Sequence, residues 1–268
     1  YIQVSAGSRH ICAVDALGAL ACWGGKASPQ LGEEHLWTSS RNDPRFWSVE
    51  SGEDFTCAIS RGFEAPSGAE SVNTLHCRGQ NPRLAPAYQQ HLNFFATNPV
   101  AAVSIGFGAF CVIIDTNLAI KCFGTAVPAL LQQVPTTGTY KMISVGWSGN
   151  ACAIRATDSF MVCWGVQWGN SFQLYPTQFD SVAVGEDWVC AVRTLGKTLQ
   201  CYGMYVPKVF VSYDSVPQTP IAQISVYGRL LCIVSTESEV QCYGQGNAAW
   251  PVLLASRSDI PKAIQDVA

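Results

Sequence analysis

Twelve cysteines divide into six pairs that recur along the chain of 268 residues. From Cys12 to Cys232, the first cysteines of the pairs span 220 residues in five intervals, a mean of 44. The second cysteine follows 10 or 11 residues after the first in five pairs, and 20 residues after it in one. The six pairs are Cys12 and Cys22, Cys57 and Cys77, Cys111 and Cys122, Cys152 and Cys163, Cys190 and Cys201, and Cys232 and Cys242. Such a period indicates an array of structural repeats.

The residues around the cysteines repeat as well. A β-branched stretch ending in glycine precedes each first cysteine, as in "VSAG" and "VSIG". The residue after each second cysteine is aromatic in five repeats, and Arg78 is the exception. Each is then followed by a glycine: Gly24, Gly79, Gly124, Gly165, Gly203 and Gly244. The whole chain therefore consists of one repeated unit.

Each pair of cysteines brackets a predicted β-hairpin. The intervening segments are rich in Val, Ile and aromatic residues and contain a central turn, such as Asp15–Gly18. Opposed residues of a hairpin have Cβ atoms about 4.5–5.5 Å apart, close to the ~3.8 Å that a disulfide prefers. We therefore expect a disulfide within each of the six pairs, each worth roughly 2.5–3 kcal/mol in the chain-entropy model. An even number of cysteines fits an oxidising compartment.

The spacing argues against a metal or redox site. Structural zinc sites use closely spaced Cys or His pairs, whereas no two cysteines here are closer than ten residues. The four histidines, His10, His35, His76 and His91, do not recur with the repeat. The sequence therefore predicts no metal and no cofactor.

An all-β propeller is the fold that these repeats predict. A lead-in strand, a hairpin and a fourth short strand give about four strands per 44 residues, and radial packing of such sheets buries both faces. We expect a single propeller domain over 1–268. The approximate repeats are 1–44, 45–98, 99–138, 139–177, 178–219 and 220–260, with the start of a further strand at 261–268. Seven blades, one truncated or missing, are favoured over six because 261–268 matches the other lead-in segments.

Composition excludes several function classes. Only 13% of residues are charged and the net charge is −3, which argues against nucleic acid as a partner. No apolar run reaches the roughly 18 residues of a membrane span, and no leader is present, so we expect any signal peptide to have been removed. The sequence contains no catalytic constellation and no phosphate-binding glycine loop. We therefore expect a protein that is not an enzyme.

The first repeat, "VSAGSRHICAVDALGALACWGGKASPQLG", resembles the regulator of chromosome condensation repeat. The matching residues are Gly7, His10, Trp23-Gly24 and Gln30–Gly32. The match weakens along the chain, because the position of His10 becomes Phe55, Ala109, Asn150, Trp188 and Leu230 in later repeats. The nuclear branch of the family, which acts in guanine-nucleotide exchange on chromatin, lacks paired blade cysteines and carries basic patches, so it fits poorly.

The resemblance is stronger to the ectodomains of plant CRINKLY-type receptor kinases. Their repeats place a cysteine before a short hairpin and "CWG" after it, and an early repeat is enlarged, as Phe63–Asn73 enlarges the second repeat here. This resemblance implies an extracellular, membrane-anchored sensing ectodomain, with the kinase domain elsewhere in the full-length protein. The cysteine-rich domain and Asn-x-Ser/Thr sites of such ectodomains are absent from the sequence. The alternative is a secreted bacterial-type propeller that acts as a protein inhibitor, adhesin or carbohydrate-binding module.

Candidate ligand residues follow the lead-in glycines, where the repeats differ most. Variable loops on a regular frame are suited to recognition, and aromatic side chains dominate binding hot spots. The candidate ligand face comprises Arg9, Glu53, Asp54, Phe107, Trp147, Glu186, Asp187, Tyr227 and Arg229. Of these, Phe107, Trp147 and Tyr227 are the expected anchors, with packing on a neighbouring blade as the alternative. The expected ligand is an extracellular peptide or protein, with carbohydrate as a second choice.

Two further expectations concern large residues and long loops. We expect Trp23, Trp164 and Trp188 to pack in the core between blades. The long excursions Lys26–Trp47 and Gly62–His76 are additional candidate binding segments.

Overall fold

The computed structural model describes residues 1–7, 10–24, 44–61, 73–125, 128–166, 169–203, 220–227, 230–237, 240–244 and 252–253. The chain forms two compact units, Tyr1–Thr139 and Tyr140–Ala268, and each is described by itself. Strands dominate both units. Among the described residues, no helix has the length and apolar character needed to cross a membrane.

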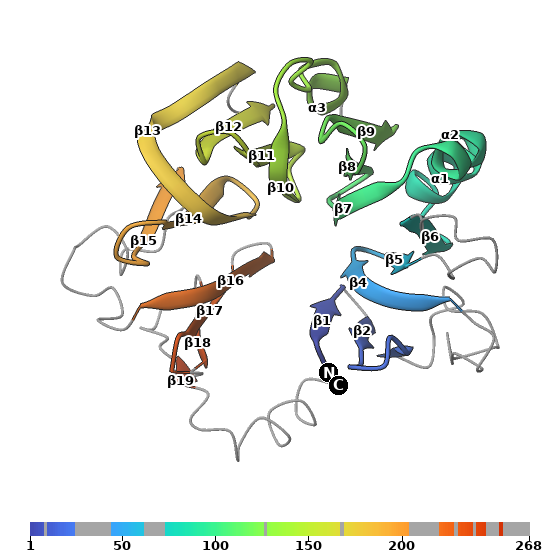
Figure 1. The fold of residues 1–268 in the computed structure, drawn as a ribbon, viewed down its shortest axis with the longest axis horizontal. Coiled ribbons are helices and arrows are strands. Elements are labelled where there is room, and N and C mark those ends of the chain that lie inside the picture. The colour runs from blue at the N-terminus through green and yellow to red at the C-terminus, as the bar shows by residue number, and fades with distance from the viewer. Residues whose placement is uncertain are drawn as a thin grey trace. The chain divides into compact units, whose positions relative to one another are not determined.

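Unit one contains three antiparallel sheets, each with three strands in chain order (Figure 1). The first sheet comprises β1 (Gln3–Ala6), β2 (His10–Val14) and β3 (Leu20–Gly24). The second comprises β4 (Arg45–Ser51), β5 (Phe55–Arg61) and β6 (Thr74–Gly79). The third comprises β7 (Val100–Ile105), β8 (Ala109–Ile114) and β9 (Ile120–Gly124). Each sheet is the lead-in strand and hairpin that the sequence predicts.

Unit two contains the next three repeats. Its first sheet has six strands: β10 (Tyr140–Val145), β11 (Asn150–Arg155), β12 (Phe160–Gly165), β13 (Gly169–Val184), β14 (Trp188–Arg193) and β15 (Leu199–Gly203). The first half of β13 pairs with β12 and the second half with β14, so one long strand ends one repeat and begins the next. The last sheet has the four strands β16 (Ile221–Tyr227), β17 (Leu230–Ser235), β18 (Val240–Gly244) and β19 (Val252–Leu253).

Three short helices stand where a fourth strand was expected in the second and third repeats. They are α1 (Leu84–Gln90), α2 (Leu92–Thr97) and α3 (Pro128–Gln132), and α1 lies against β6 and β9. The buried side chains Leu84, Tyr88 and Phe95 recur at helical spacing. The expectation of four strands in these two repeats was therefore wrong, because a local helical pattern overrides the repeat.

The cysteines of each pair face each other directly across the hairpin. Five disulfides join Cys12 to Cys22, Cys57 to Cys77, Cys111 to Cys122, Cys152 to Cys163 and Cys190 to Cys201. Cys232 is also disulfide-bonded, and its register partner is Cys242, whose side chain lies outside the described residues. The within-repeat pairing expected from hairpin geometry is confirmed for these five pairs.

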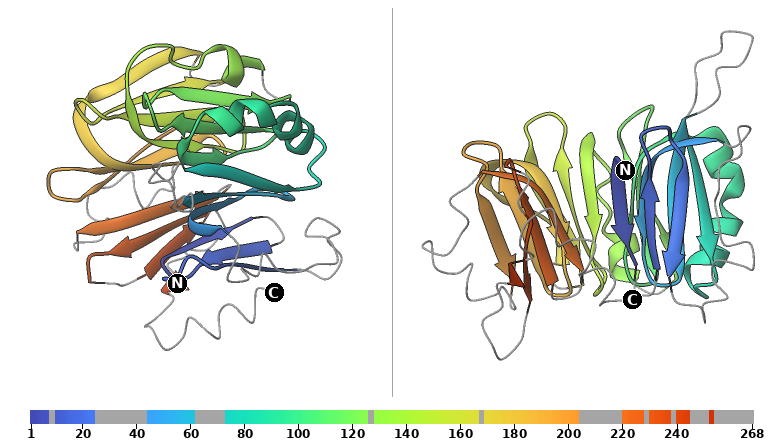
Figure 2. Two further views of the ribbon diagram at one scale, coloured as in Figure 1. Left: turned by 45° about the vertical axis from the view of Figure 1, so that its right-hand side comes forward. Right: turned by 90° about the horizontal axis from the view of Figure 1, so that it is seen from below.

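The sheets of each unit stack face to face (Figure 2). Apolar side chains of neighbouring sheets form shared core clusters. In unit one, Val14 and Leu20 of the first sheet pack against Phe46 and Val49 of the second. Trp164 and Trp188 are fully buried, as expected. Trp23 differs: its side chain is 41% exposed and lies beside Tyr1. Because Trp23 alternates with the core residue Cys22 along β3, it belongs to the opposite face of the first sheet.

Candidate binding surface

Six of the predicted ligand residues are described, and they lie in tight turns that join the first two strands of a repeat. We call these connections, at residues 52–55, 106–109, 146–150 and 185–188, the glycine turns. In each, the backbone N–H of the glycine donates to a carbonyl three or four residues later, over 2.8 to 2.9 Å. These turns are closed hairpin connections, and each presents only one or two side chains between its hydrogen-bonded ends.

Neighbouring glycine turns within a unit are in direct contact. A Cβ atom on Gly146 would overlap the carbonyl oxygen of Gly185. A Cβ atom on Gly7, the lead-in glycine of the first repeat, would likewise overlap the carbonyl oxygen of Gly52. The Ser148 hydroxyl also donates to the carbonyl of Glu186. The lead-in glycine is therefore required by the close approach of the next turn.

A second layer of residues supports the turns and was missed by sequence reasoning. In the three repeats where the structure describes it, the residue after the "Cys-x-Gly" motif donates its N–H to the glycine turn of its own repeat. Gln80 donates to Asp54 over 3.0 Å, Thr125 to Gly108 over 3.2 Å and Val166 to Gly149 over 3.4 Å. All three side chains are exposed, and Val166 is 57% exposed. Their fixed position after the motif was the signal that could have identified them.

The described candidate residues of unit one gather around the segment that leads into α1. The Asn81 side chain donates to the carbonyl of Glu53 over 3.0 Å, and the backbone N–H of Asn81 donates to the carbonyl of Asp54 over 3.2 Å. The guanidinium of Arg83 lies 4.5 Å from the ring centre of Phe107. Glu53, Asp54 and Phe107 are half-buried, so this segment limits their exposure.

The described candidate residues of unit two form a second group. Trp147, Glu186 and Asp187 are half-buried, and the Ser148 contact holds their two turns together. Arg9, Arg229 and the side chain of Tyr227 lie outside the described residues, as do most of the excursions Lys26–Trp47 and Gly62–His76. The structure therefore places six of the nine candidates, three in each unit.

His10 is a buried residue of the first sheet that contacts the second sheet. Its Nε2 lies 2.5 Å from the Thr56 hydroxyl, and both residues are buried. Burial lowers the pKa of His10, and the carboxylate of Asp54 opposes this shift. Phe55, at the corresponding position of the second repeat, likewise contacts Phe110 of the third, with ring centres 6.0 Å apart. In the part of the chain that the structure describes, no group of three His, Cys, Asp or Glu could hold a metal ion.

Lead-in strands are also linked by side chains that bond to the next lead-in backbone. The Ser5 hydroxyl accepts the N–H of Ser51 over 2.8 Å, and the Ser144 hydroxyl accepts the N–H of Val184 over 3.0 Å. Glu50 lies beside Ser51, and its Oε2 is 3.5 Å from the Ser5 hydroxyl. Burial raises the pKa of Glu50 to about 7, against a smaller lowering by the Ser5 hydrogen bond.

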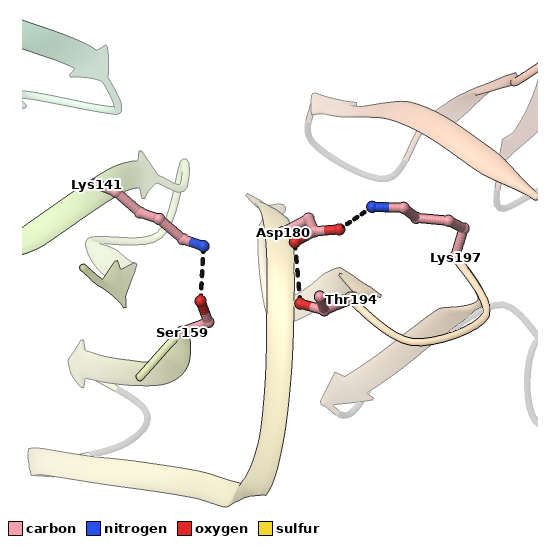
Figure 3. A network of polar contacts seen from close by, with 5 residues as sticks. All are labelled: Lys141, Ser159, Asp180, Thr194 and Lys197. Atoms are coloured by element: carbon pink, nitrogen blue, oxygen red, sulfur yellow. Dashed lines mark hydrogen bonds and ion pairs between the residues drawn. The ribbon is translucent and has the colours of Figure 1, made fainter. Parts of the chain in front are cut away.

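The other end of the sheets carries the turns of the cysteine hairpins, and it is more exposed. Leu17 and Leu195 at two of these turns are 77% and 84% exposed. In unit two, Lys141 donates to Ser159 over 2.7 Å, and Asp180 accepts from Lys197 and Thr194 (Figure 3). The hydrogen bond from Lys197 is the main cause that lowers the pKa of Asp180.

Comparison with known proteins supports the fold. No family model matches the chain, and no curated protein matches its sequence. The CRINKLY WD40 ectodomain of the receptor kinase ACR4 from Arabidopsis thaliana superposes with a TM-score of 0.65 at 18% identity, over 94% of this chain and 82% of that one. The entire ectodomain of the receptor kinase CR4 from Physcomitrella patens gives 0.65 at 16% identity, over 93% of this chain and 64% of that one.

A third similar structure is a propeller of the regulator of chromosome condensation type. Prp20p from Saccharomyces cerevisiae superposes with a TM-score of 0.60 at 11% identity, over 90% of this chain and 71% of that one. The chain has a β-propeller fold. It resembles the CRINKLY-type ectodomain propellers and, more distantly, the regulator of chromosome condensation propeller. The number of blades stays a prediction, because 254–268 lies outside the described residues.

Proposed function

We propose that this propeller is the extracellular ligand-binding ectodomain of a plant receptor-like kinase and is itself non-catalytic. The observation that carries the proposal is the disulfide across the hairpin of successive repeats, in a fold similar to CRINKLY-type ectodomains. Disulfides persist in oxidising compartments, which supports an extracellular location. The ligand is a peptide or protein that contacts the glycine turns.

Within this proposal, Phe107 and Trp147 are the anchors among the described residues. Each is aromatic and half-buried, and each lies in a turn that is closed by a backbone hydrogen bond. Rigid, partly exposed aromatic side chains are typical binding hot spots because they bury a large area at low entropic cost. Glu53 and Asp54 in unit one, and Glu186 and Asp187 in unit two, supply polar groups to the ligand face. Arg9, Arg229 and the side chain of Tyr227, which complete the predicted ligand face, lie outside the described residues.

The complete transcript tests the receptor assignment directly. We expect an open reading frame that encodes this propeller, a membrane span and a kinase domain, and a fluorescent fusion of its product at the plasma membrane. An open reading frame that ends near the propeller, without a membrane span, would overturn the receptor assignment and favour the secreted alternative.

Binding of the labelled domain to plant suspension cells tests the ligand face. Phe107→Ala and Trp147→Ala are each expected to weaken saturable binding about 10-fold or more, the effect of losing a hot-spot side chain. Leu195→Ala is the matched control, because Leu195 is 84% exposed at the opposite end of its sheet. Loss of binding in the control alone would move the ligand face to that end.

A further inference from the structure

One position on the lead-in strands is nearly uniform across the repeats. The residue directly opposite each first cysteine is a serine in four repeats, an alanine in one and a glutamate in one. In chain order these residues are Ser5, Glu50, Ser104, Ser144, Ala183 and Ser225. Glu50 is therefore the single ionisable side chain at this position.

Glu50 lies in the middle of the contact between the first and second sheets. On β1, the Gln3 amide accepts the N–H of Val49 over 3.0 Å and donates to its carbonyl over 3.1 Å. The Ser5 hydroxyl accepts the N–H of Ser51, which leaves its own proton directed to Glu50 Oε2 at 3.5 Å. The two bonded residues Val49 and Ser51 thus flank Glu50, so any change at its carboxyl acts on this contact.

The surroundings of Glu50 offer little compensation for a negative charge. β4 packs against β1, β2, β5 and β7, whose titratable residues outside the disulfides are His10 on β2 and Arg61 on β5. Burial lowers the pKa of His10, which leaves it neutral near pH 7. Arg61 stands opposite Arg45 across the strands, at the end of β4 far from Glu50. The turn that follows β4 contains only the acidic residues Glu53 and Asp54 as further charged groups. Glu50 is half-buried, and a partly desolvated carboxylate without a nearby cation is costly.

We propose that protonation of Glu50 controls how tightly the first sheet packs against the second, and so regulates the contact between Gly7 and the glycine turn at Gly52. With its proton, the neutral carboxyl is accommodated between β1 and β4. When the proton leaves to solvent, the charge favours separation of the sheets and hydration of the carboxylate. The contact between Gly7 and Gly52 loosens with them, beside Glu53 and Asp54 of the candidate ligand face.

The direction of the pH effect follows from the raised pKa. The pKa of the Glu50 carboxyl rises from 4.5 to about 7 in the folded protein, so the folded state holds the proton more tightly. Its contribution is fully present below pH 4.5, is lost progressively as the pH rises to about 7, and is constant above that. An acidic extracellular fluid would keep the first sheet packed against the second.

Amide hydrogen exchange of β1 in the wild type and in Glu50→Gln tests the proposal. The ratio of wild-type to variant exchange rates is expected to rise at least about tenfold from pH 4.5 to pH 8. Taking the ratio cancels the intrinsic pH dependence of exchange and the titration of His10, which both proteins share. Glu237→Gln, an exposed charge removal in the other unit, should keep the wild-type profile.

A constant ratio would overturn the proposal, and so would a ratio that falls with pH. If Glu50→Gln fails to fold, Glu50→Ser replaces it, because serine is the residue found here in four repeats. The regulatory role rests on the proposed function, but the pH dependence of the packing between the two sheets does not. Hydrogen exchange is measured without ligand, so a negative result for the packing of the sheets is distinguishable from a failure of the proposed ligand binding.

Discussion

The two units use the same link between lead-in strands, but in different electrostatic settings. In both, a serine hydroxyl accepts a backbone N–H of the next lead-in strand, Ser51 in unit one and Val184 in unit two. The residue just before that N–H is Glu50 in unit one and Ala183 in unit two. Ala183 is 6% exposed and packs with Trp188 and Ile224. One backbone frame therefore carries a titratable contact in one place and an apolar contact in the other.

Transferring the carboxyl to unit two should have the largest effect. Ala183→Glu places a carboxyl in an apolar cluster, and we expect a loss of roughly 3 kcal/mol or more in the free energy of unfolding at pH 8, and less at pH 5. Chemical unfolding at the two pH values measures this loss. Ala222→Glu on β16, where the side chain is exposed, is the matched control. Equal losses at both sites and both pH values would contradict the comparison.

The contact between glycine turns should be the next most sensitive feature. Gly146→Ala forces a methyl group into the carbonyl of Gly185, and we expect it to cost about 2–3 kcal/mol. Gly7→Ala should behave alike in unit one, where the added methyl group overlaps Gly52. Gly196→Ala would bring its methyl group no closer than 3.7 Å to any neighbour and should cost only about 1 kcal/mol, because the φ of 78° is unfavourable for a residue with a Cβ atom.

Removing the serine hydroxyls should have the smallest effect, and here the units should differ in pH dependence. Ser5→Ala and Ser144→Ala each leave a lead-in N–H without its acceptor, at a cost of about 1–2 kcal/mol. Ser5→Ala also removes the hydrogen bond that lowers the pKa of Glu50, so its stability should fall more steeply with rising pH than that of the wild type. Thermal unfolding at pH 5 and pH 8 distinguishes the two variants. The same pH response in both variants would show that the Ser5 hydroxyl does not affect the pKa of Glu50.

The sequence predicted the hairpins and their disulfides because both follow from local geometry. A turn between two cysteines 10 or 11 residues apart brings them into register, as Cys12 and Cys22 show. The helices α1 and α2 were missed because the repeat suggested another strand, although the spacing of Leu84, Tyr88 and Phe95 was visible. At this place the local helical spacing was a better guide to the secondary structure than the strand pattern of the other repeats.

The candidate site was only partly predictable. Sequence variation after the lead-in glycines identified the turns, but it did not show that Phe107 would lie under Arg83 or that the Trp147 turn would be held to the Glu186 turn. Those contacts join residues that are distant in sequence. The serine position opposite the first cysteine was visible in "VSAG" and "VSIG", but only strand pairing shows what its hydroxyl binds.

Peptide mapping under non-reducing conditions tests the central claim, that every repeat is closed by its own disulfide in an oxidising compartment. In protein purified from its native source, we expect the five observed links and a sixth between Cys232 and Cys242, with no free thiol. Links between different repeats, or cysteines that remain reduced, would contradict both the blade-by-blade architecture and the extracellular location.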